Sequence, residues 1–259
     1  ATIVERMKLF HPDEILYVVD KRQELHFIQV FRCARKTGLV EDDTKLSFLG
    51  FGTMNGKDGK PFKTREGGVM RLENLIADID EEMFTKIVEN RSVRDKDARD
   101  TAKIVGLAAI KYGDLSNQAT KDYIFDVDRF TSFEGNTGPY ILYTIVRIKS
   151  ILNRYVEAGG NLEAGEILPA SNGSEKNLML QLSGFGSMIE SAFEEKAPHK
   201  ICAYIYEVSN AFNSFYHETK ILSEENQAQK ESYIRLLQLT KRVLETSIDL
   251  LGFEAPDKM

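Results

Sequence analysis

The hydrophobic pattern of this chain changes near Arg71, and that change limits the folds open to it. Before it, a β-branched apolar run at residues 14–20, suited to a buried parallel strand, and a second expected strand at residues 45–51 flank a segment with helical spacing at residues 23–36. A strand, a helix and a strand in this order predict an open parallel sheet of the doubly wound type. The alternation is too short for a complete sheet, and Ala1 falls inside an expected helix, so we expect a piece of a longer chain.

Beyond this point apolar residues recur every three or four positions, as they do in amphipathic helices. The longest such segments cover residues 174–195, 198–218 and 224–251, and their short connections predict a helical bundle. The predicted fold class is therefore α/β followed by all-α, with part of a Rossmann-type parallel sheet preceding the bundle. We expect the domain boundaries to give residues 1–95, a connecting segment 96–133, and a bundle at 134–259.

Composition narrows the function classes only slightly. A hydrophobic content of 42% with 29% charged residues is typical of globular proteins, and no apolar run is long enough for a membrane span. The formal charge of -6 argues against a general nucleic-acid coat but leaves room for a local basic surface. Cys33 and Cys202 lie far apart in helical patterns, which predicts buried thiols in a reducing compartment, the cytoplasm.

The segment GNTGPYILYTIVRIKS, residues 135–150, combines a strained turn with an amphipathic helix. Spacings of three and four place Tyr140, Tyr143 and Arg147 on one helix face. Two rings beside a guanidinium are suited to stacking on unpaired bases and to holding phosphate. A helix start with two half-buried tyrosines explains the same pattern equally well.

A second polar and aromatic stripe follows the helix predicted at residues 198–218. Tyr206, Asn210, Asn213 and His217 lie beside its apolar stripe. Asparagine inside a helix carries a propensity cost, which favours a role in reading base edges. The alternative is a polar seam against a neighbouring helix.

The loop GKDGKPFKTREGG, residues 56–68, is the strongest catalytic candidate. Its glycines allow close approach to a ligand, and Lys60, Lys63 and Arg65 concentrate positive charge that could stabilise a polyphosphate. It does not match the Walker A pattern. An exposed basic hairpin without a ligand is the alternative.

The segment YVVDKRQELHF, residues 17–27, places Asp20, Gln23 and His26 where a parallel strand ends. Ligands of open α/β sheets bind at such ends. A capping or core histidine is the alternative for His26. No spacing in the sequence indicates a metal site, and no serine or cysteine has a recognisable base.

Five motifs in this order resemble one family, the arginyl-tRNA synthetases of class I. They are YVVDKRQELHF, GKPFKTREGG, DYIFDVDRFTSFEGNTGPYILYTIVRIKSIL, PHKICAYIYEVSNAFNSFYHE and ETSIDLLGFEAPDKM. The resemblance covers nearly the whole chain and corresponds to the family's C-terminal portion. It implies part of a catalytic domain at residues 1–95 and a helical anticodon-binding domain at residues 134–259.

The resemblance also implies roles for individual residues. The mobile loop that stabilises the ATP phosphates would comprise Lys60, Lys63, Thr64 and Arg65. The arginine and adenylate site would involve Gln23, His26 and Asp20. The anticodon arm of tRNA(Arg) would meet Asn136, Tyr140, Tyr143, Arg147, Asn210, Asn213, Tyr216 and Met259. ATP would be a substrate accompanied by Mg²⁺, with no metal held by the protein, and neither DNA nor a membrane would be a partner.

The family's His-x-Gly-His-type signature, which holds ATP, has no counterpart in this sequence. From the resemblance we expect the parent protein to be an arginine–tRNA ligase. Because the signature is missing, we expect this chain alone to be inactive. Two alternatives remain open: a non-catalytic tRNA-binding module related to the synthetases, and a helical scaffold for protein interactions.

Overall fold

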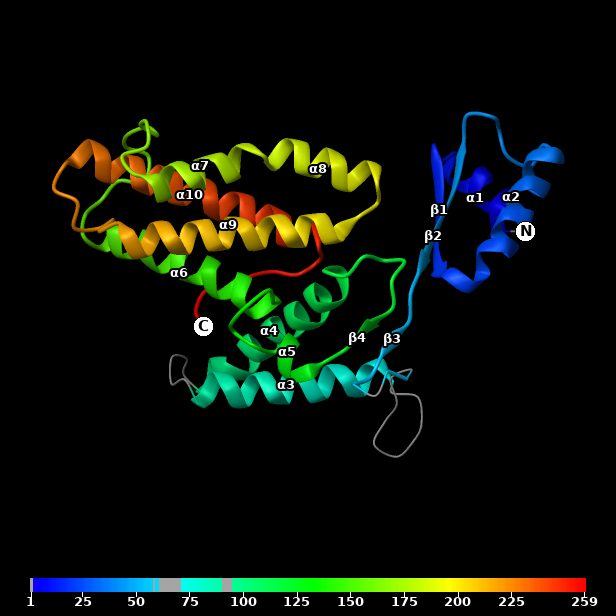
Figure 1. Ribbon diagram of the computed structural model, residues 1–259, viewed down its shortest axis with the longest axis horizontal. Helices are drawn as coiled ribbons and strands as arrows, with labels where there is room; N and C mark the ends of the chain where they lie inside the picture. The colour runs from blue at the N-terminus through cyan, green and yellow to red at the C-terminus, as the bar shows by residue number, and fades with distance from the viewer. Residues whose placement is uncertain (1, 58, 61–70, 90–94) are drawn as a thin grey trace. The chain divides into compact units, whose positions relative to one another are not determined.

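The computed structural model describes residues 2–57, 59–60, 71–89 and 95–259 (Figure 1). The chain divides into two compact units. The first comprises Ala1–Phe62 with Asn117–Ile124, and the second comprises Lys63–Ser116 with Phe125–Met259.

The first unit is built on the predicted strand, helix and strand. Its elements are α1 (Thr2–Phe10), β1 (Glu14–Asp20), the 3₁₀ turn η1 (Lys21–Gln23), α2 (Glu24–Lys36) and β2 (Lys45–Phe51). The two strands pair in parallel along their whole length, from Glu14 opposite Lys45 to Asp20 opposite Phe51. The sequence-based prediction of a parallel β-α-β unit is therefore confirmed.

The core of this unit lies on one face of the two strands. Ile3 of α1, Ile15 of β1 and Ala34 of α2 are buried together. On β1, Leu16 and Val18 have 40% and 55% of their surface exposed. The expectation of a buried strand at residues 14–20 is thus wrong for one face of β1, because α1 and α2 both pack on the side of Ile15.

A distant stretch of sequence completes the first unit. The short strand β3 (Met54–Asn55) pairs in parallel with β4 (Tyr123–Ile124). The Asp122 carboxylate accepts from Lys21 Nζ at 2.8 Å and from the Thr53 backbone nitrogen at 2.7 Å, and the Lys21 hydrogen bond lowers its pKa. These contacts hold the carboxyl ends of β1 and β2 beside the segment that precedes the helical bundle.

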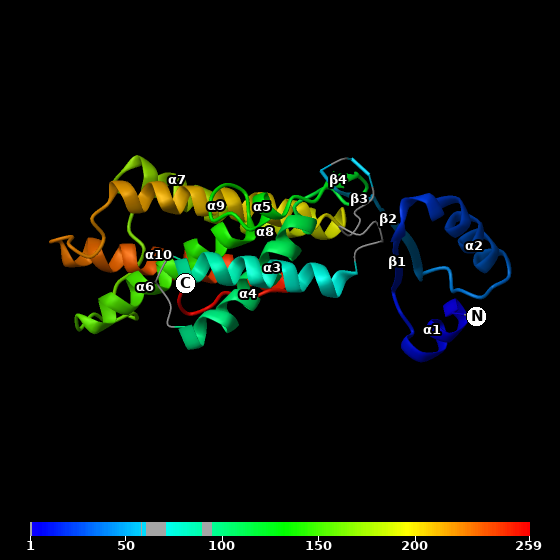
Figure 2. The same ribbon diagram turned by 90° about the horizontal axis from the view of Figure 1, so that it is seen from below.

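The second unit consists of helices joined by loops, with no strand among its described residues (Figures 1 and 2). Its helices are α3 (Leu72–Glu89), α4 (Asp95–Leu115), α5 (Val127–Phe130), α6 (Gly138–Glu157), α7 (Gly173–Ser183), α8 (Phe185–Glu194), α9 (Pro198–Glu218) and α10 (Gln227–Leu250). In both views α6, α7, α9 and α10 run alongside one another, while α3 packs on α4 and α4 on α6. The predicted helical bundle is confirmed.

The predicted apolar stripes form the core of the bundle. On α9, Ile205, Phe212 and Phe215 are fully buried, as are Ile141 and Ile145 on α6. The α10 stripe is buried in the same way, at Ile234, Leu237, Leu244, Ile248 and Leu251. Long helices with one apolar face therefore bury that face against their neighbours, as their periodicity requires.

Three details differ from the sequence-based predictions. The single helix expected at residues 174–195 is two helices that meet at Gly184, since a Ser-Gly pair favours a helix break. The spacing in α3 predicts one apolar stripe, of which Leu75, Ile79 and Met83 are buried but Leu72 and Ile76 are exposed. Cys202 is buried as predicted, but Cys33 is exposed, because α2 turns only Ala34 fully into its core. No helix among the described residues is long and apolar enough to span a bilayer.

Candidate functional site

The turn before α6 fixes where that helix begins. Gly135 has a φ of +79°, which a glycine adopts readily, and Thr137 caps the helix by accepting from the Tyr140 backbone nitrogen at 3.2 Å. Pro139 occupies the first turn, where its missing N–H costs nothing. The predicted turn and amphipathic helix are therefore confirmed, and α6 presents Tyr140, Tyr143 and Arg147 toward α9.

A chain of hydrogen bonds joins α6 to α9. Arg147 Nη1 donates to Asn213 Oδ1 at 2.6 Å, and Asn213 Nδ2 donates to the Tyr140 hydroxyl at 2.9 Å. The Tyr140 hydroxyl in turn donates to Asn210 Oδ1 at 2.8 Å. Two pairs of residues more than sixty positions apart in the sequence thus form one network.

Two aromatic rings flank the Arg147 guanidinium in this network. Its central carbon lies 4.7 Å from the Tyr143 ring centre and 5.3 Å from the Tyr216 ring centre. Tyr143 and Tyr216 keep 41% and 37% of their surface exposed. We call Tyr140, Tyr143, Arg147, Asn210, Asn213 and Tyr216 the α6/α9 face. It presents half-exposed rings and a cation held in place before any ligand arrives.

Tyr140 has a more structural position than its spacing suggested. Its ring packs edge-on against Tyr206, with ring centres 5.7 Å apart, and burial raises the pKa of its hydroxyl. The hydroxyl therefore stays protonated and holds Asn210 and Asn213 in position. Within the α6/α9 face, Tyr143 and Tyr216 are the rings with most surface available for stacking.

Asn136 lies in a contact between α4 and α9. The buried Tyr112 hydroxyl is 2.6 Å from Asn136 Oδ1 and 2.8 Å from the Cys202 carbonyl oxygen, and it shares its proton between these acceptors. Desolvation raises the pKa of this hydroxyl. The side-chain oxygen of Asn136 is thus committed to the fold at the turn that precedes α6.

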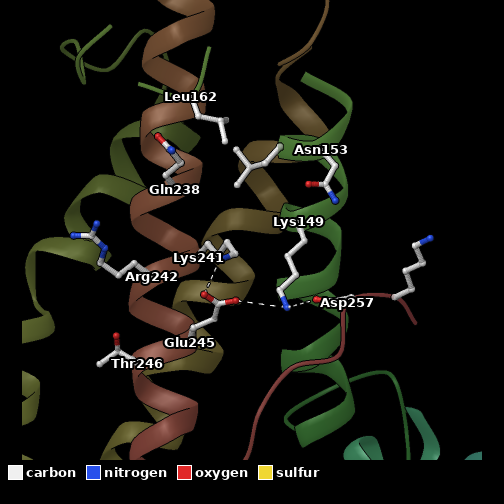
Figure 3. Close-up of a pocket in the computed structure, with 11 residues that line it drawn as sticks. Lys149, Asn153, Leu162, Gln238, Lys241, Arg242, Glu245, Thr246 and Asp257 are labelled. Carbon is white, nitrogen blue, oxygen red and sulfur yellow. Dashed lines mark hydrogen bonds and ion pairs between the residues drawn. The ribbon is translucent and has the colours of Figure 1, made fainter. Parts of the chain in front are cut away.

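Lys149 of α6 and Lys111 of α4 anchor the segment that leads to Met259, and Figure 3 shows the position of Lys149 beside Asp257. Lys149 Nζ of α6 donates to the carbonyls of Ala255 and Pro256 at 3.3 and 3.2 Å, and Lys111 of α4 donates to the Gly252 carbonyl. Lys149 also pairs with carboxylates at 3.7 and 3.5 Å, those of Glu245 and Asp257. The segment before Met259 is therefore bound to the helices rather than loose.

A cavity of about 830 Å³ lies between α6 and α10 beside this anchor (Figure 3). Lys149, Lys241 and Arg242 contribute positive charge, while Glu245 pairs with both lysines at 3.7 and 2.7 Å. Residues two apart on a helix point about 200° apart, so Lys149 faces away from Arg147. The cavity is distinct from the α6/α9 face.

In the first unit, the candidate residues lie together at the carboxyl end of β1. Asp20 accepts from the Arg22 backbone nitrogen at 2.8 Å and from Arg22 Nε at 2.9 Å, and these hydrogen bonds lower its pKa to about 2. Gln23 ends the 3₁₀ turn η1 and His26 lies on the first turn of α2, and both residues are exposed. Arg22 was not singled out from the sequence, although an aspartate two residues ahead of an arginine at a helix start could have indicated this pairing.

The predicted phosphate loop is described only in part. The Lys60 carbonyl accepts from the Gly56 backbone nitrogen at 2.8 Å. Lys63, Thr64 and Arg65 lie outside the described residues. Among the described residues, no group of three or more His, Cys, Asp or Glu side chains could hold a metal ion.

Comparison with known protein families identifies the class of protein to which this chain belongs. The family model described as "tRNA synthetases class I (R), catalytic domain" matches residues 1–127, and the DALR anticodon binding domain matches residues 141–259. The catalytic-domain match includes α3 and α4 as well as the parallel strands, and the anticodon-binding match covers α7 to α10 and nearly all of α6.

Two curated relatives and one solved structure, each named as an arginyl-tRNA synthetase or arginine–tRNA ligase, are similar to this chain over its whole length. The chain is 66% identical to the arginine–tRNA ligase of Agathobacter rectalis and 58% identical to that of Alkaliphilus oremlandii, over 100% of its own length and 45% and 44% of theirs. The arginyl-tRNA synthetase structure from Plasmodium falciparum matches with a TM-score of 0.82 and 26% identity, over 100% of this chain and 43% of that one. The chain thus belongs to the arginyl-tRNA synthetase family and spans less than half the length of these relatives.

Proposed function

We propose that this chain is part of an arginine–tRNA ligase and that its α6/α9 face binds the anticodon arm of tRNA(Arg). The ligase reaction activates arginine with ATP and transfers the arginyl group to tRNA. The observation that carries the RNA-binding part is the hydrogen-bond chain that fixes Arg147 between the Tyr143 and Tyr216 rings. Membership of the family and the match to an anticodon binding domain support the same assignment.

The geometry of the face favours unpaired bases over a duplex. Exposed aromatic rings bind bases by stacking, and only splayed bases of loops, bulges or ends offer their flat faces. Each stacked base contributes about 1–3 kcal/mol. Because Tyr143 and Tyr216 both lie against one guanidinium, a base on either ring lies close to a cation that can also contact phosphate.

The charge of the chain agrees with a local RNA contact. A protein with a formal charge of -6 has no general attraction for RNA, so its affinity must come from a few placed cations and rings. Each phosphate neutralised on a single strand contributes about 0.7 to the salt slope of binding. We therefore expect the salt dependence of binding to be shallow and the contribution of stacking to be large.

Binding of a tRNA(Arg) transcript, measured by fluorescence anisotropy, tests the proposal. Arg147→Met should weaken binding by about tenfold or more, because it removes a charge-assisted contact. Tyr143→Leu should weaken it to a similar extent by removing a stacking ring. Arg242→Met removes an exposed cation from α10, away from the face, and is the matched control.

The outcomes distinguish RNA binding by the α6/α9 face from a protein scaffold and from a diffuse electrostatic contact. Loss with Arg147→Met and Tyr143→Leu, together with normal binding by Arg242→Met, supports the proposal. No binding of tRNA(Arg) by the wild type, or equal binding by all variants, contradicts it and favours a helical scaffold for protein interactions. Weaker binding by all variants alike indicates a diffuse electrostatic contact and also contradicts it.

The catalytic part of the proposal rests on the family alone. We propose residues 1–95 as part of the catalytic domain, 96–133 as a connector, and 134–259 as the anticodon-binding domain. Lys60, Lys63, Thr64 and Arg65 would stabilise the phosphates of ATP and its accompanying Mg²⁺, while Asp20, Gln23 and His26 would serve the arginine and adenylate site. The setting we propose is the cytoplasm.

A direct assay tests this catalytic part. We expect the purified chain to form no arginyl-tRNA from arginine, ATP and tRNA(Arg), because the His-x-Gly-His-type signature is not in its sequence. Measurable arginyl-tRNA formation would contradict that expectation. A full-length protein that contains this chain should be active, and inactivity of that protein would favour a non-catalytic tRNA-binding module.

A further inference from the structure

Each hydrogen bond of the α6/α9 face is donated in the same order along the network: Arg147 donates to Asn213, Asn213 donates to Tyr140, and Tyr140 donates to Asn210. A guanidinium donates and never accepts, so the Asn213 atom that faces Arg147 must be its oxygen. The Asn213 amide nitrogen then donates to Tyr140, and the Tyr140 proton has to go to a further acceptor, Asn210 Oδ1. Asparagine oxygen and nitrogen are usually hard to tell apart, but here the chemistry of Arg147 fixes both side chains.

This direction determines what Asn210 can offer to a ligand. Its oxygen is used inside the network, which leaves the two N–H groups of its amide. Asn210 is partly exposed, and its amide nitrogen donates to no residue that the structure describes. An asparagine with both groups available pairs with adenine through the N7 acceptor and the N6 donor. Asn210 has only the donor half of that pattern.

Arg147, joined to Asn210 through the network, also offers only hydrogen-bond donors to a ligand. Arg147 uses one N–H on Asn213, and its remaining N–H groups are donors too. The half-exposed rings of Tyr143 and Tyr216, which both lie against the Arg147 guanidinium, provide surfaces on which a base can lie. The face therefore combines stacking rings with fixed donors and is complementary to a base edge that carries acceptors.

We propose that Asn210 is a specificity-determining residue that selects an unpaired base by its acceptor edge and discriminates against adenine. Cytosine and guanine each have an edge with two adjacent acceptors, O2/N3 and O6/N7, and uracil has the acceptors O2 and O4 on either side of its N3–H donor. The adenine edges around N6 instead pair each acceptor with a donor. This inference rests on the proposed binding of RNA by the α6/α9 face.

The test measures base preference, which a purely structural role of Asn210 would not change. The probes are hairpin RNAs with the anticodon stem and loop of tRNA(Arg), each with one loop base replaced in turn by adenine. At one loop position the wild type should bind the adenine hairpin about tenfold more weakly, as expected for one lost hydrogen bond and an unpaired donor. Asn210→Ala should reduce that difference to about twofold or less.

Asn210→Asp provides the sharper variant because it has nearly the same shape. Its carboxylate still accepts from Tyr140 but presents an acceptor outward, so adenine at the selected position should now bind better relative to the original base. Ser214→Asp, at an exposed position one turn further along α9, adds the same charge and should weaken all hairpins alike. If Asn210→Ala does not fold, as judged by circular dichroism, Asn210→Asp still decides the question.

The outcomes distinguish this inference from the proposed function. A base preference that persists in both Asn210 variants overturns the inference while RNA binding stands. Absence of binding by the wild type overturns the proposed function and the inference with it. A preference that is lost in Asn210→Ala and shifted toward adenine in Asn210→Asp, but kept in Ser214→Asp, supports the inference.

Discussion

Gly138 lies at the first turn of α6, where this helix touches the backbone of α4. A Cβ atom added at position 138 would lie 2.3 Å from the Ala108 carbonyl oxygen and 2.6 Å from its carbon. Contacts this short do not occur, and the neighbour is backbone, so it cannot swing away. Gly138→Ala therefore requires α6 to move away from α4.

Two opposing effects set the size of the change. Alanine in place of glycine in a helix usually raises the free energy of unfolding by about 0.5–1 kcal/mol. Forcing an extra methyl group into a packed contact costs about 1–3 kcal/mol. The second effect is larger, so the free energy of unfolding should fall by about 1 kcal/mol, which lowers the urea midpoint by about 0.5 M at an m-value of about 2 kcal/mol/M.

Urea unfolding followed by helical circular dichroism measures this change, with the transition of the helical unit fitted separately because the chain has two units. Gly186→Ala in α8 is the matched control, since a Cβ there would meet nothing within 4 Å. The control should be as stable as the wild type or slightly more stable. A Gly138→Ala protein with a midpoint at or above that of the wild type would refute the reasoning.

Three further predictions concern Lys149, Tyr112 and the two cysteines. Lys149→Met leaves two carbonyls of the terminal segment without their donor and should lower the free energy of unfolding by about 1–3 kcal/mol. Carboxypeptidase should also digest the variant faster, and an unchanged rate of digestion would contradict the anchoring role of Lys149. Tyr112→Phe removes the hydroxyl bound to the Cys202 carbonyl and should cost about 1–2 kcal/mol in urea unfolding, and a neutral result would contradict that pairing. Burial raises the pKa of Cys202 from its usual 9.0 to about 12, so its contribution to stability is present below pH 9 and is lost as pH rises from 9 to 12. Iodoacetamide on the native protein should modify Cys33 and spare Cys202, and mass spectrometry showing equal modification would contradict this burial.

Local patterns predicted most elements of the fold. The strands at residues 14–20 and 45–51 and the helix at residues 198–218 coincide with β1, β2 and α9. Hydrophobic periodicity depends on a few neighbouring residues, so it can be read from the sequence. The break at Gly184 was missed, although the Ser-Gly pair at residues 183–184 is a local signal that favours one.

The candidate site was predictable only within one helix at a time. Spacing along α6 placed Tyr140, Tyr143 and Arg147 together, and that grouping is confirmed. No spacing rule relates Arg147 to Asn213, since they lie on different helices. The lysine loop stays a prediction, because all but one of its chosen residues lie outside the described part of the chain.

The sequence by itself determined the periodicity of each element, the order of sheet and bundle, and the family resemblance, because these depend on local composition and motif order. Tertiary structure decided which polar groups are engaged and which remain for a ligand. Asn210 and Asn213 look alike in the sequence, yet Arg147 orients one through the other and leaves the Asn210 amide nitrogen without an acceptor among the described residues. A hydrogen bond has direction, and that direction exists only once α6 and α9 have packed together.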